Sequence, residues 1–398
     1  MTKIGVLFMQ SQEWFGADSQ IHASIMRHLP RDRFDVHCAV SKQHGTETSD
    51  ARRGVERIPD VKLRPTEFGP TFNANDGSRP AVETIRRSVP TIVSLLGLAW
   101  YIRRNRIRIV HCTEKPRDAI NGTVVAFLGG ARCVIHLHVK AENWIRWLVR
   151  RSMHHAAGLI GVTEFVAQSI RDQGYAPSRV FAVLNGLECD DWVDQSTDGP
   201  AVRREFGIAP ETPLIASVSR LYRYKGQHEL LKALPAVKEH YPDVMVLVVG
   251  EDDPRAFQEA GSYTEELKAL CRELSLEDNV VFTGFRRDVR AIMSACDIYS
   301  MPSFEEPFGM VFTEAMALER PVVALDNGGT KEVVVNGVTG LLSDRDDTGT
   351  LATNLLRLLD DPALRAEMGR KGKQRVVEFL NSKRMADEVA AVYETITR

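Results

Sequence analysis

The sequence predicts an α/β protein built from two doubly wound, Rossmann-like domains. Three observations support this fold class. The chain has 398 residues, which is enough for two domains of ordinary size. Short apolar runs alternate with helical patterns along most of its length, as in parallel α/β sheets. Several of these runs lead through a short loop directly into a helix, at the sheet edge where such folds bind ligands.

Composition is that of an ordinary globular protein, with 43% hydrophobic and 26% charged residues. The formal net charge of −2 gives no chain-wide attraction for nucleic acid, so we expect no nucleic-acid partner. Six scattered cysteines without a C-x-x-C pair predict reduced thiols rather than a zinc or redox site. No segment approaches the roughly 20 apolar residues of a membrane span, and the N-terminus lacks a signal peptide. We therefore expect a cytoplasmic protein.

The first half opens with an apolar strand at residues 4–9, followed by a loop containing Gly16 and a helix. Gly16 either lets an anion approach the backbone or simply turns the chain, and the turn is slightly favoured unless the second domain supplies the phosphate site. The connection at 66–80 is long and rich in Gly, Pro, Asn and Asp, which is typical of functional or mobile loops. The strand at 133–138 ends in His138, where ligand-facing residues of an open sheet lie.

Two predicted helices of this half combine apolar and basic residues. The helix at about 90–105 ends in arginines, as suits a helix C-terminus. Residues 144–151 mix tryptophans and arginines. This second helix could lie on an anionic membrane surface, or it could bury Trp144 and Trp147 in the core with its arginines outside. We favour the core interpretation.

A polar stretch at 191–200 is the best candidate for a linker. We therefore predict a first domain at 1–195, a second domain at 196–380, and a final helix at 381–398. The second series of strands and helices begins at residue 214.

Two cations follow the first strand of the second domain. Arg220 and Lys225 come from the same strand-to-helix loop, so both can meet a diphosphate, Arg as a planar fork and Lys as a point charge. The alternative is a solvated basic loop. The position at the carboxyl end of a strand favours the phosphate interpretation.

The segment 302–317 contains a second anion site. A buried strand precedes it, and helical composition begins at Met310, so the loop ends at a helix N-terminus. The amides of Gly309, Met310 and Val311 would be unpaired donors there, and the helix dipole attracts anions to that end. A phosphate or an anionic leaving group fits this place.

Two glutamates flank these amides. Glu306 precedes them, and Glu314 follows Met310 by about one helical turn. Both carboxylates could accept hydrogen bonds from hydroxyls on either side of a bound phosphate, which suits a sugar nucleotide. Taken alone, an acidic loop and an exposed glutamate at a helix start would explain them equally well.

With these residues in place, the chain resembles the retaining glycosyltransferases of the GT-B fold, most closely family 4, also called group 1. The family's two glutamates, which are separated by seven intervening residues, match Glu306 and Glu314, and its Arg and Lys pair matches Arg220 and Lys225. The resemblance implies two Rossmann-like domains facing across a cleft. The first would bind the acceptor and the second the nucleotide sugar, with the final helix crossing back to the first domain.

The resemblance also implies roles for single residues. Arg220 and Lys225 would bind the diphosphate and offset charge on the leaving group, Glu314 would hold the ribose hydroxyls, and Glu306 with the Gly309 and Met310 amides would hold the donor sugar. Further matches are His138, facing the donor sugar; Phe285, Arg286 and Val289, beside the base; Val311, at the donor site; and Asn185 with Gly186, near the hinge. The catalytic group would thus be His138, Arg220, Lys225 and Glu306. One departure stands out, because members commonly carry paired glycines after the first strand where this chain has Phe15-Gly16-Ala17-Asp18.

The implied reaction transfers a sugar from a nucleoside-diphosphate sugar, with a UDP-sugar favoured, to an acceptor hydroxyl. We expect no metal and no further cofactor, and a same-face mechanism in which the leaving phosphate deprotonates the acceptor. The acceptor could be a saccharide, a lipid-linked sugar or a small molecule, and contact with the inner face of a membrane is left open. The alternatives are a binding subunit without turnover, or a sugar-nucleotide epimerase or phosphorylase on the same architecture.

Overall fold

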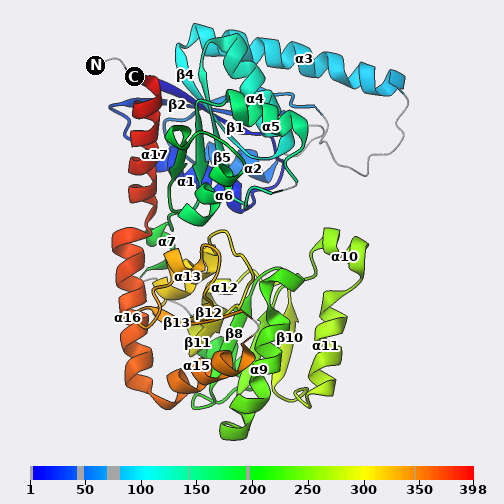
Figure 1. Ribbon diagram of the computed structural model, residues 1–398, viewed down its shortest axis with the longest axis vertical. Coiled ribbons are helices and arrows are strands. Elements are labelled where there is room, and N and C mark those ends of the chain that lie inside the picture. Colours follow the sequence, from blue (N-terminus) through cyan, green and yellow to red (C-terminus); the bar gives the residue numbers. More distant parts are fainter. Residues whose placement is uncertain (1–2, 43–48, 70–80, 143, 194–197, 346) are drawn as a thin grey trace. The chain divides into compact units, whose positions relative to one another are not determined.

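A computed structural model describes residues 3–42, 49–69, 81–142, 144–193, 198–345 and 347–398 (Figure 1). The chain divides into two compact units, Met1–Gly186 with Ser382–Arg398, and Leu187–Asn381. The division falls shortly before the boundary predicted at residue 195, and the final helix is counted with the first unit. Residues 70–80 of the predicted long loop and 194–197 of the predicted linker lie outside the described residues.

The first unit contains one parallel sheet in the order β3-β2-β1-β4-β5-β6-β7. The direction of winding reverses between β1 and β4. Helices α1, α2 and α17 pack together, as do α3, α4 and α5. The strands are β1 (Ile4–Gln10), β2 (Phe34–Ser41), β3 (Lys62–Thr66), β4 (Ile107–Thr113), β5 (Arg132–Leu137), β6 (Gly158–Gly161) and β7 (Val180–Ala182). The helices are α1 (Ala17–His28), α2 (Asp50–Glu56), α3 (Ala81–Arg104), α4 (Pro116–Gly129), α5 (Trp147–His155), α6 (Glu164–Asp172), η1 (Pro177–Arg179) and α17 (Ser382–Thr397).

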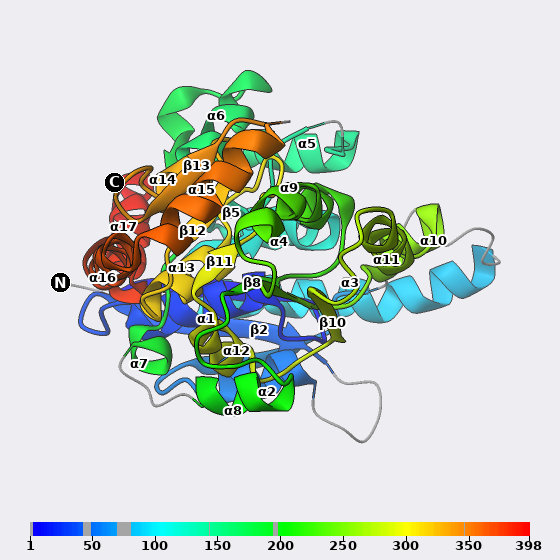
Figure 2. The ribbon, with the colours of Figure 1, turned by 90° about the horizontal axis from the view of Figure 1, so that it is seen from below.

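The second unit has a parallel sheet in the order β10-β9-β8-β11-β12-β13, which can be followed in Figure 2 from β10 through β8 and β11 to β13. Its winding reverses between β8 and β11. Helix α9 packs with α11 and α15, and α12 packs with α8 and α13. The strands are β8 (Leu214–Val218), β9 (Met245–Val249), β10 (Val280–Gly284), β11 (Ile298–Ser300), β12 (Val322–Leu325) and β13 (Gly340–Ser343). The helices are α7 (Cys189–Trp192), α8 (Gly199–Glu205), η2 (Arg223–Lys225), α9 (Gln227–His240), α10 (Pro254–Ala260), α11 (Tyr263–Glu273), α12 (Val289–Ala295), α13 (Met310–Ala317), α14 (Thr330–Val333), α15 (Thr348–Asp360) and α16 (Pro362–Phe379).

The predicted fold class, two doubly wound α/β units, is confirmed. The strands are short and buried because helices cover both faces of each sheet; all five residues of β8 and all four of β12 are buried. Two helix predictions were incomplete. Helix α3 begins at Ala81, well before Pro90. Helix α16 was not predicted; Asp361 caps it by accepting a hydrogen bond from the Leu364 amide.

Candidate active site

The second unit brings a cation and a carboxylate together where its winding reverses. Strands β8 and β11 are neighbours in the sheet, and the loops after them carry Lys225 and Glu306. Lys225 Nζ lies 2.7 Å from Glu306 Oε2, with side-chain exposures of only 14% and 8%. Burial acts to lower the pKa of Lys225, but the carboxylate of Glu306 and the Tyr224 hydroxyl outweigh it and raise the pKa above its ordinary value. Ligands of open α/β sheets bind at this switch point.

Backbone contacts fix the two loops against each other. The amide of Phe304 donates to the carbonyl oxygen of Tyr224 at 2.6 Å. Gly226, next to Lys225, has φ +76°, and a Cβ there would come within 1.9 Å of the Pro302 carbonyl oxygen. Only glycine allows this approach, so the backbone itself sets the position from which Lys225 reaches Glu306.

A third loop, after β12, supports the glutamate from the other side. The Gly329 amide donates to the Glu306 carbonyl oxygen at 2.7 Å, and the Glu305 amide donates to Asn327 Oδ1 at 2.6 Å. Glu305 has φ +49°, an unusual conformation for a residue with a side chain. Asn327 and Gly329 were not among the predicted site residues. Their signal was the Asn-Gly-Gly run at the carboxyl end of β12, a place where ligand loops occur.

Helix α13 begins at Met310, four positions after Glu306. Gly309, the residue immediately before the helix, has φ +80°, and a Cβ there would come within 2.4 Å of the Phe312 ring. The amides of Met310 and Val311 belong to the first turn, where helices have free donors and attract anions. Glu314 follows one turn later and is half-buried. Burial raises its pKa to about 7.

Among the other predicted donor residues of this unit, the two arginines have acidic partners of their own. Arg220 is 72% exposed and lies 2.5 Å from the Asp253 carboxylate, which belongs to the loop after β9. The structure therefore places Arg220 and Lys225 in one loop, but with different acidic partners. Phe285 is exposed, and Val289 begins α12. Arg286 binds the carboxylates of Asp288 and Glu205, which raise its pKa.

The first unit places His138 directly after β5, at the carboxyl edge of its sheet. Its backbone amide donates to Glu114 Oε2 at 3.4 Å. Burial lowers the pKa of His138 to about 3, so the imidazole is neutral at neutral pH. Burial raises the pKa of Glu114 to about 7. Gly16 lies at the N-terminus of α1 with φ −80°, an ordinary conformation that any residue can adopt.

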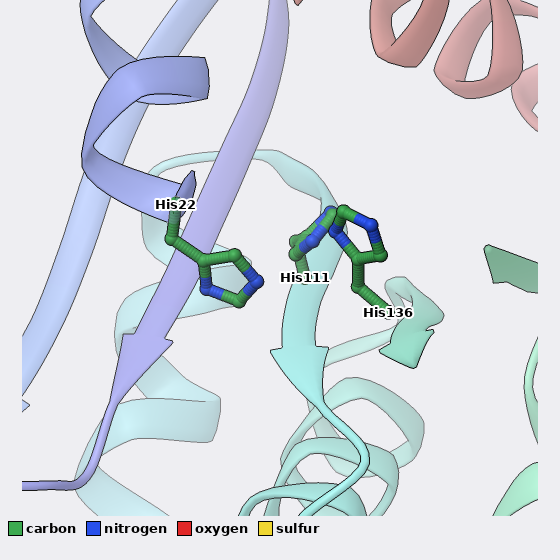
Figure 3. A group of neighbouring side chains, drawn as sticks. All are labelled: His22, His111 and His136. Atoms are coloured by element: carbon green, nitrogen blue, oxygen red, sulfur yellow. The ribbon is translucent and has the colours of Figure 1, made fainter. Parts of the chain in front are cut away.

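Three more histidines lie together in the core of the first unit (Figure 3). His22 projects from α1, His111 from β4 and His136 from β5, and one ring nitrogen of each lies within 4.8 Å of the others. His111 Nδ1 pairs with the Tyr393 hydroxyl at 2.6 Å. Both ring nitrogens of His22 and His136 have no hydrogen-bond partner among the described residues.

This histidine cluster, His22, His111 and His136, is the one group in the described ranges with an arrangement that could hold a metal ion. Zinc needs nitrogens about 2.0–2.1 Å from the metal, so the imidazoles would have to move closer together. All three are fully buried, and burial lowers the pKa of each well below 6.5. We interpret them as neutral aromatic core residues, which stack on one another and on Phe8.

The favoured core interpretation of the tryptophan segment is wrong for Trp147. This side chain is 71% exposed at the first residue of α5. Trp144 lies outside the helix, half-buried, with its Nε1 donating to the Lys140 carbonyl oxygen at 2.8 Å. The spacing of apolar residues alone could not decide whether the tryptophans are buried or exposed, because a helix of nine residues has too few turns to define one buried face.

Comparison with protein families gives two matches that together span most of the chain. Residues 198–375 match the family described as glycosyl transferases group 1. Residues 23–191 match the family described as glycosyltransferase family 4. The first match contains Arg220, Lys225, Glu306 and Glu314, and the second contains His138.

The curated relatives include a protein named as a mannosyltransferase and one named as a synthase. A GDP-mannose-dependent monoacylated α-(1-6)-phosphatidylinositol monomannoside mannosyltransferase of Corynebacterium glutamicum is 37% identical over 188 residues, covering 45% of this chain and 46% of the relative. An α-maltose-1-phosphate synthase of Mycolicibacterium smegmatis is 31% identical over 263 residues, covering 63% of this chain and 66% of the relative. The aligned part of the chain thus spans less than half of the first relative and about two thirds of the second.

Among solved structures, HepE of Anabaena in complex with UDP is similar in fold. The TM-score is 0.79 at 20% identity, with 98% of this chain and 100% of HepE covered. At that identity the likeness concerns the fold alone.

Proposed function

The chain belongs to the group 1 glycosyltransferases with the GT-B fold, and we propose that it transfers a sugar from a nucleoside-diphosphate sugar to an acceptor hydroxyl with retention of configuration. One observation carries the proposal. At the switch point of the second unit, Lys225 in the loop after β8 forms a buried pair with Glu306, which lies in the loop that leads into the N-terminus of α13. This arrangement offers cation, carboxylate and amide donors to one ligand.

Each donor group has a proposed residue. Lys225 has three N–H donors and uses one on Glu306 and one on Tyr224, which leaves one for a phosphate oxygen. The Gly309, Met310 and Val311 amides bind the same diphosphate at the helix N-terminus. Arg220 exchanges part of its contact with Asp253 for the phosphate. Glu306 accepts from sugar hydroxyls, and Glu314, when ionised, accepts from the ribose. Phe285, Arg286 and Val289 flank the base.

The proposed mechanism is attack on the same face as departure. The bond between the anomeric carbon and the phosphate oxygen breaks, and the acceptor oxygen bonds to that carbon. The acceptor proton passes to the leaving phosphate oxygen. Lys225, Arg220 and the helix amides stabilise the negative charge that develops on the leaving group. His138, neutral at the carboxyl edge of the first unit, is proposed to contact the donor sugar.

We propose that no metal ion or other cofactor is needed, since two cations and a helix N-terminus can offset the leaving charge. Activity should therefore survive incubation with EDTA. A UDP-sugar remains the proposed donor. The name of the C. glutamicum relative makes a GDP-sugar the main competitor. Acceptor recognition is proposed for the first unit, with a saccharide, a lipid-linked sugar or a small molecule as candidates, and the exposed Trp147 keeps membrane contact at α5 open.

Calorimetric titration of the full chain with UDP, GDP and ADP tests the proposal. We expect one nucleotide to bind, and Lys225→Ala and Glu314→Ala to weaken it at least tenfold (about 1.4 kcal/mol or more). Lys268→Ala is the matched control, because that lysine forms an exposed pair with Glu265 on α11. Equal binding by wild type and both site variants would refute the donor site. Tight binding without sugar transfer from any donor would instead favour a binding subunit.

A further inference from the structure

Helix α3 presents an apolar face to solvent. Surface helices of globular proteins normally place polar residues on the outward face. Here, between Val89 and Trp100, five apolar side chains recur at helical spacing and are 54–63% exposed: Val89, Ile92, Val93, Leu96 and Trp100. We call this set the α3 stripe. Packing of the unit does not explain it, because these side chains lie outside the core.

The other side of α3 already attaches the helix to its unit. Leu98, Ala99 and Ile102 are buried, and a Cβ on Gly129 of α4 would come within 2.5 Å of Ile102. Figure 1 shows α3 as a long helix along the outside of the first unit. The α3 stripe is therefore free to contact a partner while the helix stays packed. Phe127 on α4 is a further exposed aromatic residue, 82% accessible.

Within α3 itself, the charged residues that follow Thr84 are all basic. The sequence contains no Asp or Glu between Thr84 and Arg104. Arg103 and Arg104 are exposed in the last turn, on either side of the line that the stripe follows. The Arg104 guanidinium lies 5.3 Å from the Trp100 ring centroid. A partner of this face must therefore combine an apolar interior with negative charge at its edge.

We propose that the α3 stripe lies in the surface of a membrane containing anionic lipids. An amphipathic helix with leucine, isoleucine and tryptophan on one side and arginines beside them binds parallel to the bilayer, with its apolar side chains below the headgroups. Tryptophan favours that interface, and the long arginine stems keep their charge among the lipid phosphates. Within the described residues, no helix is both long and apolar enough to cross a membrane, so α3 rests on the surface rather than spanning it.

A second copy of the chain is a poorer partner for this face. A single-helix stripe of this kind presents on the order of a few hundred Å² of apolar surface. A stable dimer buries about 800 Å² on each partner. Pairing of two stripes would also leave the arginine pairs without acidic groups to meet, whereas an anionic lipid surface supplies them.

Vesicle flotation of the full-length protein tests the inference. The probes are vesicles of phosphatidylcholine alone and of an equimolar mixture with phosphatidylglycerol. We expect wild type to float with the anionic vesicles and only weakly with the neutral ones. The triple variant Val93→Ser, Leu96→Ser, Trp100→Ser should bind the anionic vesicles more than tenfold less strongly than wild type, because it lacks three exposed apolar side chains. Phe379→Ser, which removes an equally exposed aromatic residue on α16, is the matched control.

A second variant separates the contribution of the arginines from that of the apolar side chains. Arg103→Gln with Arg104→Gln should remove the preference for anionic vesicles while leaving weak neutral binding. Nucleotide binding should be unchanged in all three variants, so the result does not depend on the proposed donor site. Failure of wild type to float with anionic vesicles overturns the inference. The inference is also overturned if the wild type does not bind vesicles but forms a dimer, measured by sedimentation velocity, that the triple variant abolishes.

Discussion

Lys225 Nζ lies 2.7 Å from Glu306 Oε2, although the two residues are 81 positions apart in the chain. The contact exists because β8 and β11 are neighbours in the sheet and because Gly226 lets the two loops touch. A buried pair of this kind is costly to desolvate and is poorly justified by stability alone. A role in holding a charged ligand accounts for it better.

The first prediction concerns this pair. Lys225→Ala leaves the buried Glu306 carboxylate without its cation, so we expect the free energy of unfolding to fall by on the order of 3 kcal/mol. Lys225→Ala combined with Glu306→Gln should recover part of that loss, because no charge is then left unpaired. Urea unfolding of both variants measures the difference. If the losses in the free energy of unfolding from Lys225→Ala and Glu306→Gln simply added in the double variant, the two side chains would not be coupled.

The second prediction concerns Asn327. Its Oδ1 accepts the Glu305 amide at 2.6 Å, and its Nδ2 is buried without a partner among the described residues. Asn327→Ala should release the Glu305 backbone from its left-handed conformation and weaken nucleotide binding about three- to tenfold, the value of about one hydrogen bond. Asn327→Asp keeps the acceptor, so it should bind more tightly than Asn327→Ala. Calorimetry decides, and equal affinities for the two variants would show that the hydrogen bond has no influence on the site.

The third prediction concerns the pKa of about 7 for Glu314. Above that pH the carboxylate is ionised and can accept hydrogen bonds from ribose hydroxyls, while below it the protonated group accepts them less well. Nucleotide affinity should therefore rise as pH increases through about 7. The nucleotide phosphate titrates near 6 as well. For this reason the measurement compares wild type with Glu314→Gln, whose profile should lack the Glu314 step. Parallel profiles for the two proteins would remove Glu314 from ribose binding.

The fourth prediction concerns acid stability. His22 and His138 have pKa values of about 3 in the folded protein, against an ordinary value near 6.5. Between these values the unfolded chain binds more protons, so stability is present above about 6.5 and is lost as pH falls. Each such histidine should cost about 1.4 kcal/mol per pH unit below 6.5. Glu114 and Glu314, with raised pKa values near 7, act in the opposite direction.

A single variant isolates the histidine contribution. His22→Phe keeps a ring of similar size against Phe8 and removes the titrating group. Urea unfolding at pH 7.5 and 5.5 should show a smaller loss for His22→Phe than for wild type, by about 1 kcal/mol. His28→Phe, at the end of the same helix, serves as the control because His28 is only half-buried, whereas His22 is fully buried. An unchanged difference between the two pH values would show that His22 is not buried in its neutral form.

The sequence by itself determined the fold class and the identity of the chemical groups. Continuous apolar runs such as β1 and β8, each followed by a loop and a helix, specify parallel strands covered on both faces. The apolar run of the strand and the helical spacing after it are both local patterns, so the sequence alone shows them. The spacing of Glu306 and Glu314 around a helix start is also local, and α13 begins where that pattern places it.

Only the tertiary structure decided which groups meet. Arg220 and Lys225 share a loop, yet one pairs with Asp253 and the other with Glu306, because strand order brings a different neighbouring loop to each. Strand order is a property of non-local pairing, and no local pattern encodes it. The exposed side of α3 is undecided in the sequence for the same reason. That helix carries apolar residues on more than one side, and only its packing on α4 determines which of them are buried and which face outward.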